Sequence, residues 1–140
     1  MSAPATILLV EDEPLILLVA QTALEDAEFE VIVATNGDQA ITALRSDGRP
    51  IKALVTDVRL GAGLDGWDVA RAARRAQPRL PVIYATGDSA YLWPVHGVPN
   101  SIVVQKPYTT AQIVGALTGL LHAIDLDTDL CGSAAQSAQS

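Results

Sequence analysis

The chain has 140 residues, 49% of them hydrophobic, which is enough to bury the core of one domain. Its formal net charge of −7 argues against direct binding to nucleic acid, because phosphate contacts need a basic surface. No stretch approaches the roughly 20 apolar residues of a membrane span, and the first residues lack the pattern of a secretion signal. We therefore expect a cytoplasmic protein that acts without a membrane or nucleic acid.

Five short aliphatic runs alternate with longer helical stretches along the chain. The runs are predicted strands: Thr6–Val10, Glu30–Ala34, Ala53–Thr56, Pro81–Ala85 and Ser101–Val104. Helices are predicted in four of the stretches: from about Glu13 to Ala27, after Asn36-Gly37, after Asp65, and after Thr109 or Thr110. Since strands and helices alternate and the strands lack polar alternation, we expect an α/β fold whose parallel sheet is covered on both faces.

Three stretches depart from this regular pattern. Ala90–Val98 contains Pro94 and Gly97, so we expect a short or irregular fourth helix there. The polar residues 125–140 are predicted to be a flexible tail after a single domain at 1–124. In the first helix the run Leu15–Ala20 is too long to be all core. We expect part of it to form a docking or self-association surface, with Leu17 as the position to test.

Polar residues stand where the predicted strands end: Glu11, Asp12, Asp57, Thr86 and Lys106. The carboxyl ends of parallel strands meet in one crevice, so these side chains are expected to converge. Clustered carboxylates repel one another, so such a cluster requires either a raised pKa or a bound cation, and oxygen ligands suit Mg²⁺. A carboxylate, a metal, a lysine and a hydroxyl together indicate phosphoryl transfer onto an aspartate, with Asp57 as the nucleophile.

Two other classes of site compete with this interpretation. Gly61–Gly66 matches the G-x-G-x-x-G pattern of a dinucleotide-binding module, although no acidic residue stands where it would hold a ribose. An aspartate-based phosphatase also pairs an aspartate with Mg²⁺. Such enzymes carry a second acid two residues after the nucleophile, where this chain has Arg59.

The stretches LLVEDEP, LVTDVRL, DGWD, VIYATGD and VQKPY together resemble the receiver domain of two-component response regulators, from about Thr6 to Ile124. The resemblance implies a flavodoxin-like (CheY-like), doubly wound five-stranded parallel sheet in the order 2-1-3-4-5. It implies that Asp57 takes a phosphoryl group from a sensor histidine kinase or a histidine phosphotransfer protein. It also implies a set of ligands for Mg²⁺ or Mn²⁺: Glu11, Asp12, Asp57 and the backbone carbonyl of Arg59. Thr86 and Lys106 would bind the phosphoryl oxygens, and Lys106-Pro107 would be a cis peptide.

The sequence departs from the family pattern at the position three residues before the lysine. The family usually has an aromatic switch residue there, and this chain has Val103, so Tyr108 is an aromatic that the mechanism could use instead. YATG, KPY and the disrupted fourth helix are similar to an alphaproteobacterial subgroup, the FAT GUY receivers, often paired with HWE-type kinases. We also expect Arg59 and Asp88 to form an ion pair beside the phosphate that restricts the hydrolytic water.

The resemblance implies a switch rather than a metabolic enzyme. We expect a stand-alone receiver that assists its own phosphorylation and dephosphorylation. Its signal would pass to an unidentified downstream protein or through a homodimer, or the chain would act as a phosphate sink. The alternative is a pseudo-receiver, a scaffold that is not phosphorylated.

Overall fold

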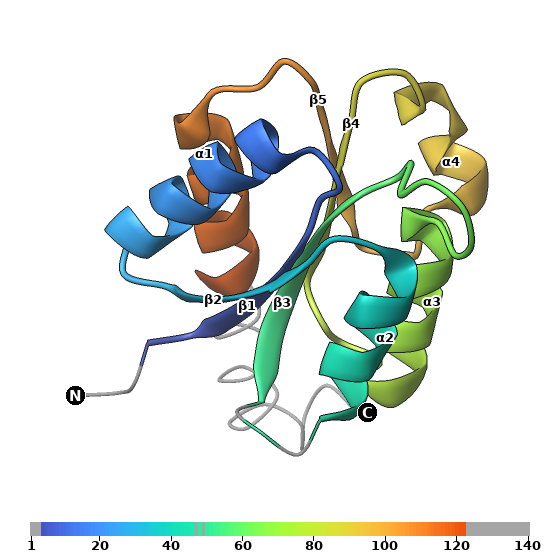
Figure 1. Cartoon of the computed structure of the whole chain (residues 1–140), viewed down its shortest axis with the longest axis horizontal. Coiled ribbons are helices and arrows are strands. Elements are labelled where there is room, and N and C mark those ends of the chain that lie inside the picture. The colour runs from blue at the N-terminus through green and yellow to red at the C-terminus, as the bar shows by residue number, and fades with distance from the viewer. Residues whose placement is uncertain (1–3, 47, 49, 123–140) are drawn as a thin grey trace, which may run out of the picture.

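The computed structural model describes residues 4–46, 48 and 50–122. Its five strands, shown in Figure 1, are β1 (Thr6–Val10), β2 (Glu30–Ala34), β3 (Ile51–Asp57), β4 (Val82–Thr86) and β5 (Ile102–Gln105). They form one parallel sheet in the order β2-β1-β3-β4-β5, which confirms the predicted topology. The prediction for β3 was too short, because backbone pairing continues past the hydrophobic run to Ile51 at one end and Asp57 at the other.

The helices cover both faces of this sheet (Figure 1). They are α1 (Pro14–Asp26), α2 (Gly37–Arg45), α3 (Gly66–Ala76), the 3-10 turn η1 (Ala90–Leu92), α4 (Trp93–His96) and a C-terminal helix described over residues 110–122. α1 and the C-terminal helix lie on one face, and α2, α3 and α4 lie on the other. The predicted domain boundary at 124 and the predicted tail at 125–140 fall outside the described residues.

Two of the helices begin at the predicted caps. The Asp65 side chain accepts the Asp68 N–H at 2.9 Å, and the Asp68 side chain accepts the Asp65 N–H at 3.1 Å. Thr109 and Gln112 form the same reciprocal arrangement before the C-terminal helix, at 3.2 and 2.7 Å. Each pair satisfies amide groups that the first turn of a helix leaves without partners, so these short sequences fix where the helices start.

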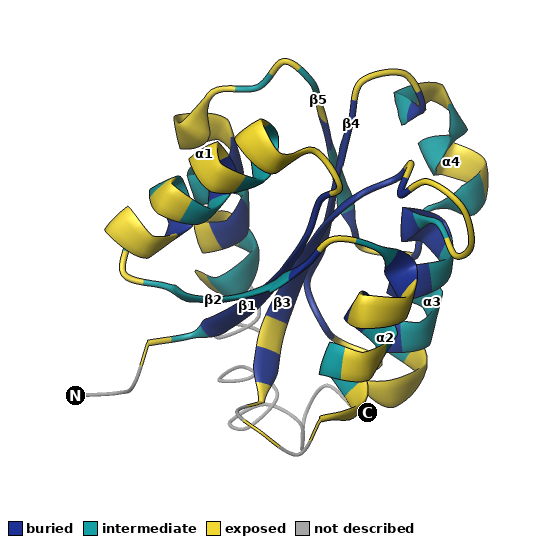
Figure 2. Cartoon of the chain, in the orientation of Figure 1, coloured by how far each residue is buried: buried dark blue, intermediate teal, exposed yellow. Residues whose placement is uncertain are grey.

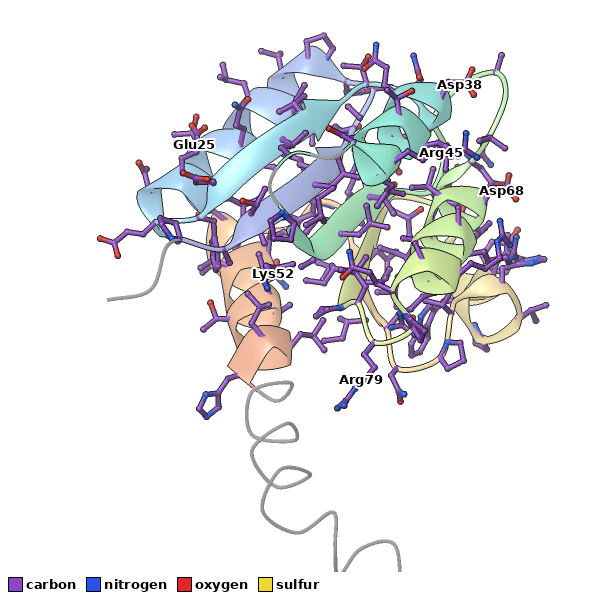
Figure 3. The ribbon with its side chains drawn as sticks, turned by 90° about the horizontal axis from the view of Figure 1, so that it is seen from below. Glu25, Asp38, Arg45, Lys52, Asp68 and Arg79 are labelled. Carbon is purple, nitrogen blue, oxygen red and sulfur yellow. The ribbon has the colours of Figure 1, made fainter. Side chains whose placement is uncertain are left out.

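The core consists of two layers, one on each face of the sheet. The strands β1, β3 and β4 between these layers are mostly buried (Figure 2). Successive strand side chains point to opposite faces, so Val82 and Tyr84 join one layer and Ile83 and Ala85 join the other. α3 contributes Trp67, Ala70 and Ala73. The C-terminal helix contributes Ile113 and Leu117. Charged side chains such as Glu25 and Asp38 project from the periphery (Figure 3).

The apolar run of α1 divides between core and surface. Ala20 and Leu24 are buried, and Leu17 packs against the same cluster. By contrast, Leu15, Leu18 and Val19 are 78%, 59% and 54% exposed. The choice of Leu17 as the surface position was therefore wrong, because the helical period turns it toward the sheet. An apolar outward face does exist, and Leu18 represents it.

The fourth crossover is irregular, as predicted. α4 has four residues and follows directly on η1. A Cβ at Gly97 would lie 2.3 Å from the Trp93 ring, so the chain can only leave α4 this closely with glycine. The Trp93 indole N–H donates to the Ser101 hydroxyl at 2.9 Å and ties α4 to the start of β5. Within the described ranges, the fold offers no helix with the length and apolar character needed to cross a bilayer.

Candidate functional site

Three of the predicted site residues meet at the carboxyl edge of the sheet. Glu11 follows β1, Asp57 ends β3 and Lys106 follows β5. The Lys106 Nζ lies 2.7 Å from Glu11 Oε1 and 3.2 Å from Asp57 Oδ2. Residues far apart in the sequence are thus joined through one ammonium group, at the position where β1, β3 and β5 end.

Asp12 completes an acidic cluster at this edge. Carboxylate oxygens of Glu11, Asp12 and Asp57 all lie within 4.8 Å of one another. Glu11 is buried, whereas Asp12 is exposed and gives the cluster access to solvent. Three carboxylates around one open point are the donor set that a hard divalent cation such as Mg²⁺ prefers, so the residues present fit such an ion.

Asp57 is held in one orientation from both of its oxygens. Oδ1 accepts the Val58 N–H at 2.7 Å, and Oδ2 accepts from Lys106. The start of α3 packs directly behind it, because a Cβ at Gly66 would lie 2.0 Å from the Asp57 carbonyl oxygen. Gly61 and Gly63 adopt φ values of 77° and 93°, which glycine tolerates best. Turn geometry and close packing therefore explain the three glycines without a dinucleotide.

The cluster perturbs the titration of its members. Burial raises the pKa of Glu11 from its ordinary value of 4.5 to about 6, and the Asp57 charge adds to the rise while the Lys106 hydrogen bond opposes it. Burial by itself would lower the pKa of Lys106. The hydrogen bond to Glu11 and the charge of Asp57 outweigh that effect, so this pKa lies above its ordinary value. Lys106 is therefore charged. Its positive charge offsets the negative charge of the carboxylates and makes it easier for Glu11 to ionise.

A chain of polar contacts runs from Thr86 to the loop after β3. The Ser89 N–H donates to Thr86 Oγ1 at 3.0 Å, and the Ser89 hydroxyl donates to Asp88 Oδ1 at 2.9 Å. Asp88 Oδ2 lies 3.0 Å from the Arg59 guanidinium, which confirms the predicted ion pair. Both charged side chains are more than half exposed, so the pair by itself adds little stability. Ser89 was not anticipated from the sequence, where it stood as an ordinary loop serine.

A tyrosine of the neighbouring strand lies beside Val103. Val103 pairs with Tyr84 in the sheet and packs against the cluster that contains it. Tyr84 is fully buried, its ring centroid lies 4.6 Å from that of Trp67, and its hydroxyl accepts the Val98 N–H at 3.0 Å. The sequence reasoning missed Tyr84. Its position two residues before Thr86, on the same face of β4, was the available signal.

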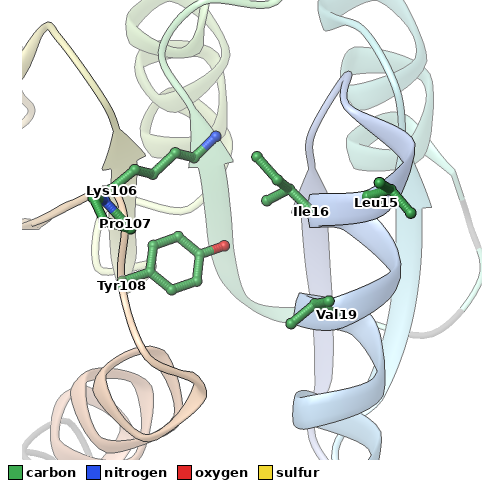
Figure 4. Close-up of a pocket in the computed structure, with 6 residues that line it drawn as sticks. All are labelled: Leu15, Ile16, Val19, Lys106, Pro107 and Tyr108. Atoms are coloured by element: carbon green, nitrogen blue, oxygen red, sulfur yellow. The ribbon is translucent and has the colours of Figure 1, made fainter.

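Tyr108 lies on the other side of the site. It lines a pocket of about 440 Å³, shown in Figure 4, together with Lys106, Pro107 and three α1 residues, Leu15, Ile16 and Val19. Burial raises the pKa of the Tyr108 phenol, and the Lys106 charge opposes the rise. Lys106-Pro107 is a cis peptide, as the resemblance implied. Tyr108 therefore borders the apolar face of α1.

The family model of the response regulator receiver domain matches residues 7–118. The chain belongs to this family. The receiver resembles a solved response regulator receiver protein from Sinorhizobium medicae WSM419, with 42% identity, a TM-score of 0.82, and coverage of 86% of this chain and 96% of that one. This membership favours the two-component interpretation over the dinucleotide-binding and phosphatase alternatives.

Two further relatives show the contexts in which such domains occur. One is the receiver domain of the sensor histidine kinase PA1611 from Pseudomonas aeruginosa PAO1, solved with a magnesium ion in its active site cleft. It is 25% identical with a TM-score of 0.73, and the match covers 86% of this chain and 99% of that one. The other is the probable transcriptional regulatory protein TcrX of Mycobacterium tuberculosis, 32% identical over 127 residues, which are 89% of this chain and 53% of that protein. The receiver spans about half the length of the curated transcriptional regulators that it matches first.

Proposed function

We propose that the receiver accepts a phosphoryl group on Asp57 from a sensor histidine kinase or a histidine phosphotransfer protein. The observation that carries this proposal is the setting of Asp57. One of its oxygens is fixed by Val58 and the other contacts Lys106, while Glu11 and Asp12 complete an acidic cluster around it. A carboxylate held in this way is a nucleophile for phosphorus, with a cation already beside it to meet the incoming negative charge.

The side chains at the site would divide the work of transfer. Glu11, Asp12 and Asp57 would hold Mg²⁺, or Mn²⁺ in its place, with the Arg59 carbonyl as the further ligand that the resemblance implies. The bound metal supplies positive charge to the phosphoryl oxygens. An Asp57 oxygen forms the new bond to phosphorus as the bond from phosphorus to the donor histidine nitrogen breaks. Lys106 and Thr86 then bind the phosphoryl oxygens.

The Arg59–Asp88 pair would control how long the phosphoryl group stays. Arg59 is two residues from Asp57, and Asp88 is two residues from Thr86, so the ion pair bridges the loops on either side of the site. Side chains at that place would obstruct a water molecule approaching along the line of the phosphorus–oxygen bond. The receiver would therefore hold its phosphoryl group longer with the pair than without it.

The exposed face of α1 is the surface we propose for the phosphodonor. Leu15, Leu18 and Val19 form an apolar strip that continues into the pocket beside Lys106 and Tyr108. A helix of the donor seated there would bring its phosphohistidine to Asp57 while burying the strip. The short α4 supports assignment to the FAT GUY subgroup, and with it an HWE-type kinase as the donor.

The output of the receiver would be a protein contact rather than a chemical product. We propose that it acts in the cytoplasm as a stand-alone switch, not as an enzyme that turns over external substrates. Phosphorylation would change its contacts with a downstream protein or a second copy of the chain, or drain phosphoryl groups from a kinase as a sink. The Pseudomonas relative is a receiver domain of a sensor histidine kinase, which supports placing this one in a kinase pathway.

Intact mass after incubation with Mg²⁺ and acetyl phosphate tests the proposal. We expect wild type to gain one phosphoryl group, a chelator to prevent the gain, and Asp57→Asn to gain none. Asp38→Asn removes an exposed carboxylate on α2 and should behave as wild type. If wild type gained no phosphoryl group from acetyl phosphate or a phosphorylated histidine phosphotransfer protein, and bound no Mg²⁺, the pseudo-receiver alternative would replace this proposal.

A further inference from the structure

The Thr86 hydroxyl accepts a hydrogen bond in the structure but donates none to the described residues. A hydroxyl group donates one hydrogen bond and accepts up to two. In the structure Thr86 Oγ1 accepts the Ser89 N–H at 3.0 Å. Among the described residues, no oxygen or nitrogen takes its hydroxyl hydrogen. Thr86 is only 1% exposed, so its hydroxyl hydrogen is a free donor that is shielded from bulk water.

Thr86 is also fixed relative to the rest of the site. Its carbonyl oxygen accepts the Lys106 N–H at 2.8 Å, which ties the end of β4 to the residue that contacts Asp57. Ala85, the residue before Thr86, pairs with Asp57 in the sheet. A phosphoryl group on Asp57 would therefore appear beside the strand end from which the Thr86 hydroxyl projects.

We propose that Ser89 is a positioning residue for phosphoryl binding, and this inference rests on the function proposed above. Its backbone N–H fills the acceptor side of the Thr86 hydroxyl, which leaves the hydroxyl hydrogen as the group that meets a phosphoryl oxygen. The hydroxyl is thus preset as a donor before the phosphoryl group arrives. Such preorganisation removes the reorientation that a freely rotating hydroxyl would need.

The rest of the polar chain holds Ser89 in place for this role. Ser89 is 4% exposed, and its hydroxyl is anchored on Asp88, whose other oxygen contacts Arg59. The loop before η1 is therefore held against β4 by the buried contact between the Ser89 backbone and Thr86. The exposed Arg59–Asp88 pair contacts the same loop and adds little to this hold.

Phosphorylation should then tighten the contact between Ser89 and Thr86. When a hydroxyl donates to a charged acceptor, its oxygen becomes a better acceptor, since linked hydrogen bonds polarise one another. The start of the segment 89–98 would be held more firmly against β4. The end of the segment is held separately, by the Val98 N–H on the buried Tyr84 hydroxyl, so that contact should not respond.

Amide hydrogen exchange at Ser89 and Val98, measured by NMR on the full chain, tests this inference. Upon phosphorylation by acetyl phosphate we expect exchange at Ser89 to slow on the order of twofold, with a downfield shift of its amide proton. Exchange at Val98 should stay unchanged. In the unphosphorylated protein, Thr86→Val should speed exchange at Ser89 about fivefold or more, because the acceptor is gone, and Thr86→Ser should restore the wild-type rate.

Tyr84→Phe serves as the matched control, because it removes the acceptor at the other end of the segment. It should expose the Val98 amide and leave Ser89 protected. Faster exchange at Ser89 on phosphorylation, or an unchanged Ser89 in Thr86→Val, would overturn the inference while the mass gain on Asp57 still stood. A wild type that gains no mass would instead overturn the proposed function, and this inference with it.

Discussion

Replacing Lys106 with methionine would remove the ammonium group from the site and keep most of the buried stem. In the folded protein this group lies 2.7 Å from Glu11 and 3.2 Å from Asp57, and only 16% of the lysine side chain is exposed. Without it, a buried carboxyl group would face a second carboxylate with no cation in contact. Glu11 would respond by taking up a proton, so the cost of the change should depend on pH.

The size of this dependence follows from the pKa of Glu11. A carboxyl whose folded pKa is raised from 4.5 to about 6 loses stability as pH rises through that interval, by about 2 kcal/mol in total. If Glu11 stayed protonated in the variant, the stability lost as pH rises would reach about 4 kcal/mol at about pH 7.5, instead of stopping at about 2 kcal/mol. The difference in the free energy of unfolding between wild type and the variant should therefore be about 2 kcal/mol larger at about pH 7.5 than at about pH 5.

Urea unfolding without Mg²⁺ at the two pH values measures this difference. Lys52→Met is the control, because Lys52 is exposed on β3 (Figure 3) and its loss should cost less than about 0.5 kcal/mol at either pH. Adding Glu11→Gln to Lys106→Met should abolish the pH-dependent part, since the group that titrates is gone. If Lys106→Met lost the same stability at both pH values, Glu11 would not be the group that Lys106 keeps ionised, and the reasoning would fail.

Three further outcomes follow from the site and from α1. The dissociation constant of Mg²⁺, measured by calorimetry, should rise about tenfold per pH unit below about pH 6, because Glu11 must lose its proton to bind the ion. A dissociation constant that did not change with pH would exclude Glu11 as a ligand. Arg59→Ala should shorten the phosphoryl lifetime followed by mass, and an unchanged lifetime would contradict the shielding role. Leu18→Glu should slow phosphotransfer from the kinase and leave the urea midpoint unchanged, whereas Leu17→Glu should lower the midpoint. Equal effects of the two variants on stability would refute the assignment of Leu17 to the core and Leu18 to the surface.

The sequence by itself determined the architecture and the chemical centre of this receiver. Unbroken aliphatic runs between helical stretches specify buried parallel strands, since only a sheet covered on both faces avoids polar alternation. Because parallel strands end at one edge, the order of polar residues along the chain was enough to bring Glu11, Asp57 and Lys106 together. Caps at Asp65 and Thr109 were readable because they act within four residues of themselves.

Only the tertiary structure decided the contacts that depend on side-chain direction and on neighbouring elements. It turned Leu17 to the core and Leu18 to solvent, a difference of one position that a continuous apolar run conceals. It placed Tyr84 beside Val103 through strand pairing, and it brought the Ser89 amide to the Thr86 hydroxyl through the path of a loop. Such contacts depend on which elements pack together and on the path of a loop, so the order of polar and apolar residues along the chain did not specify them.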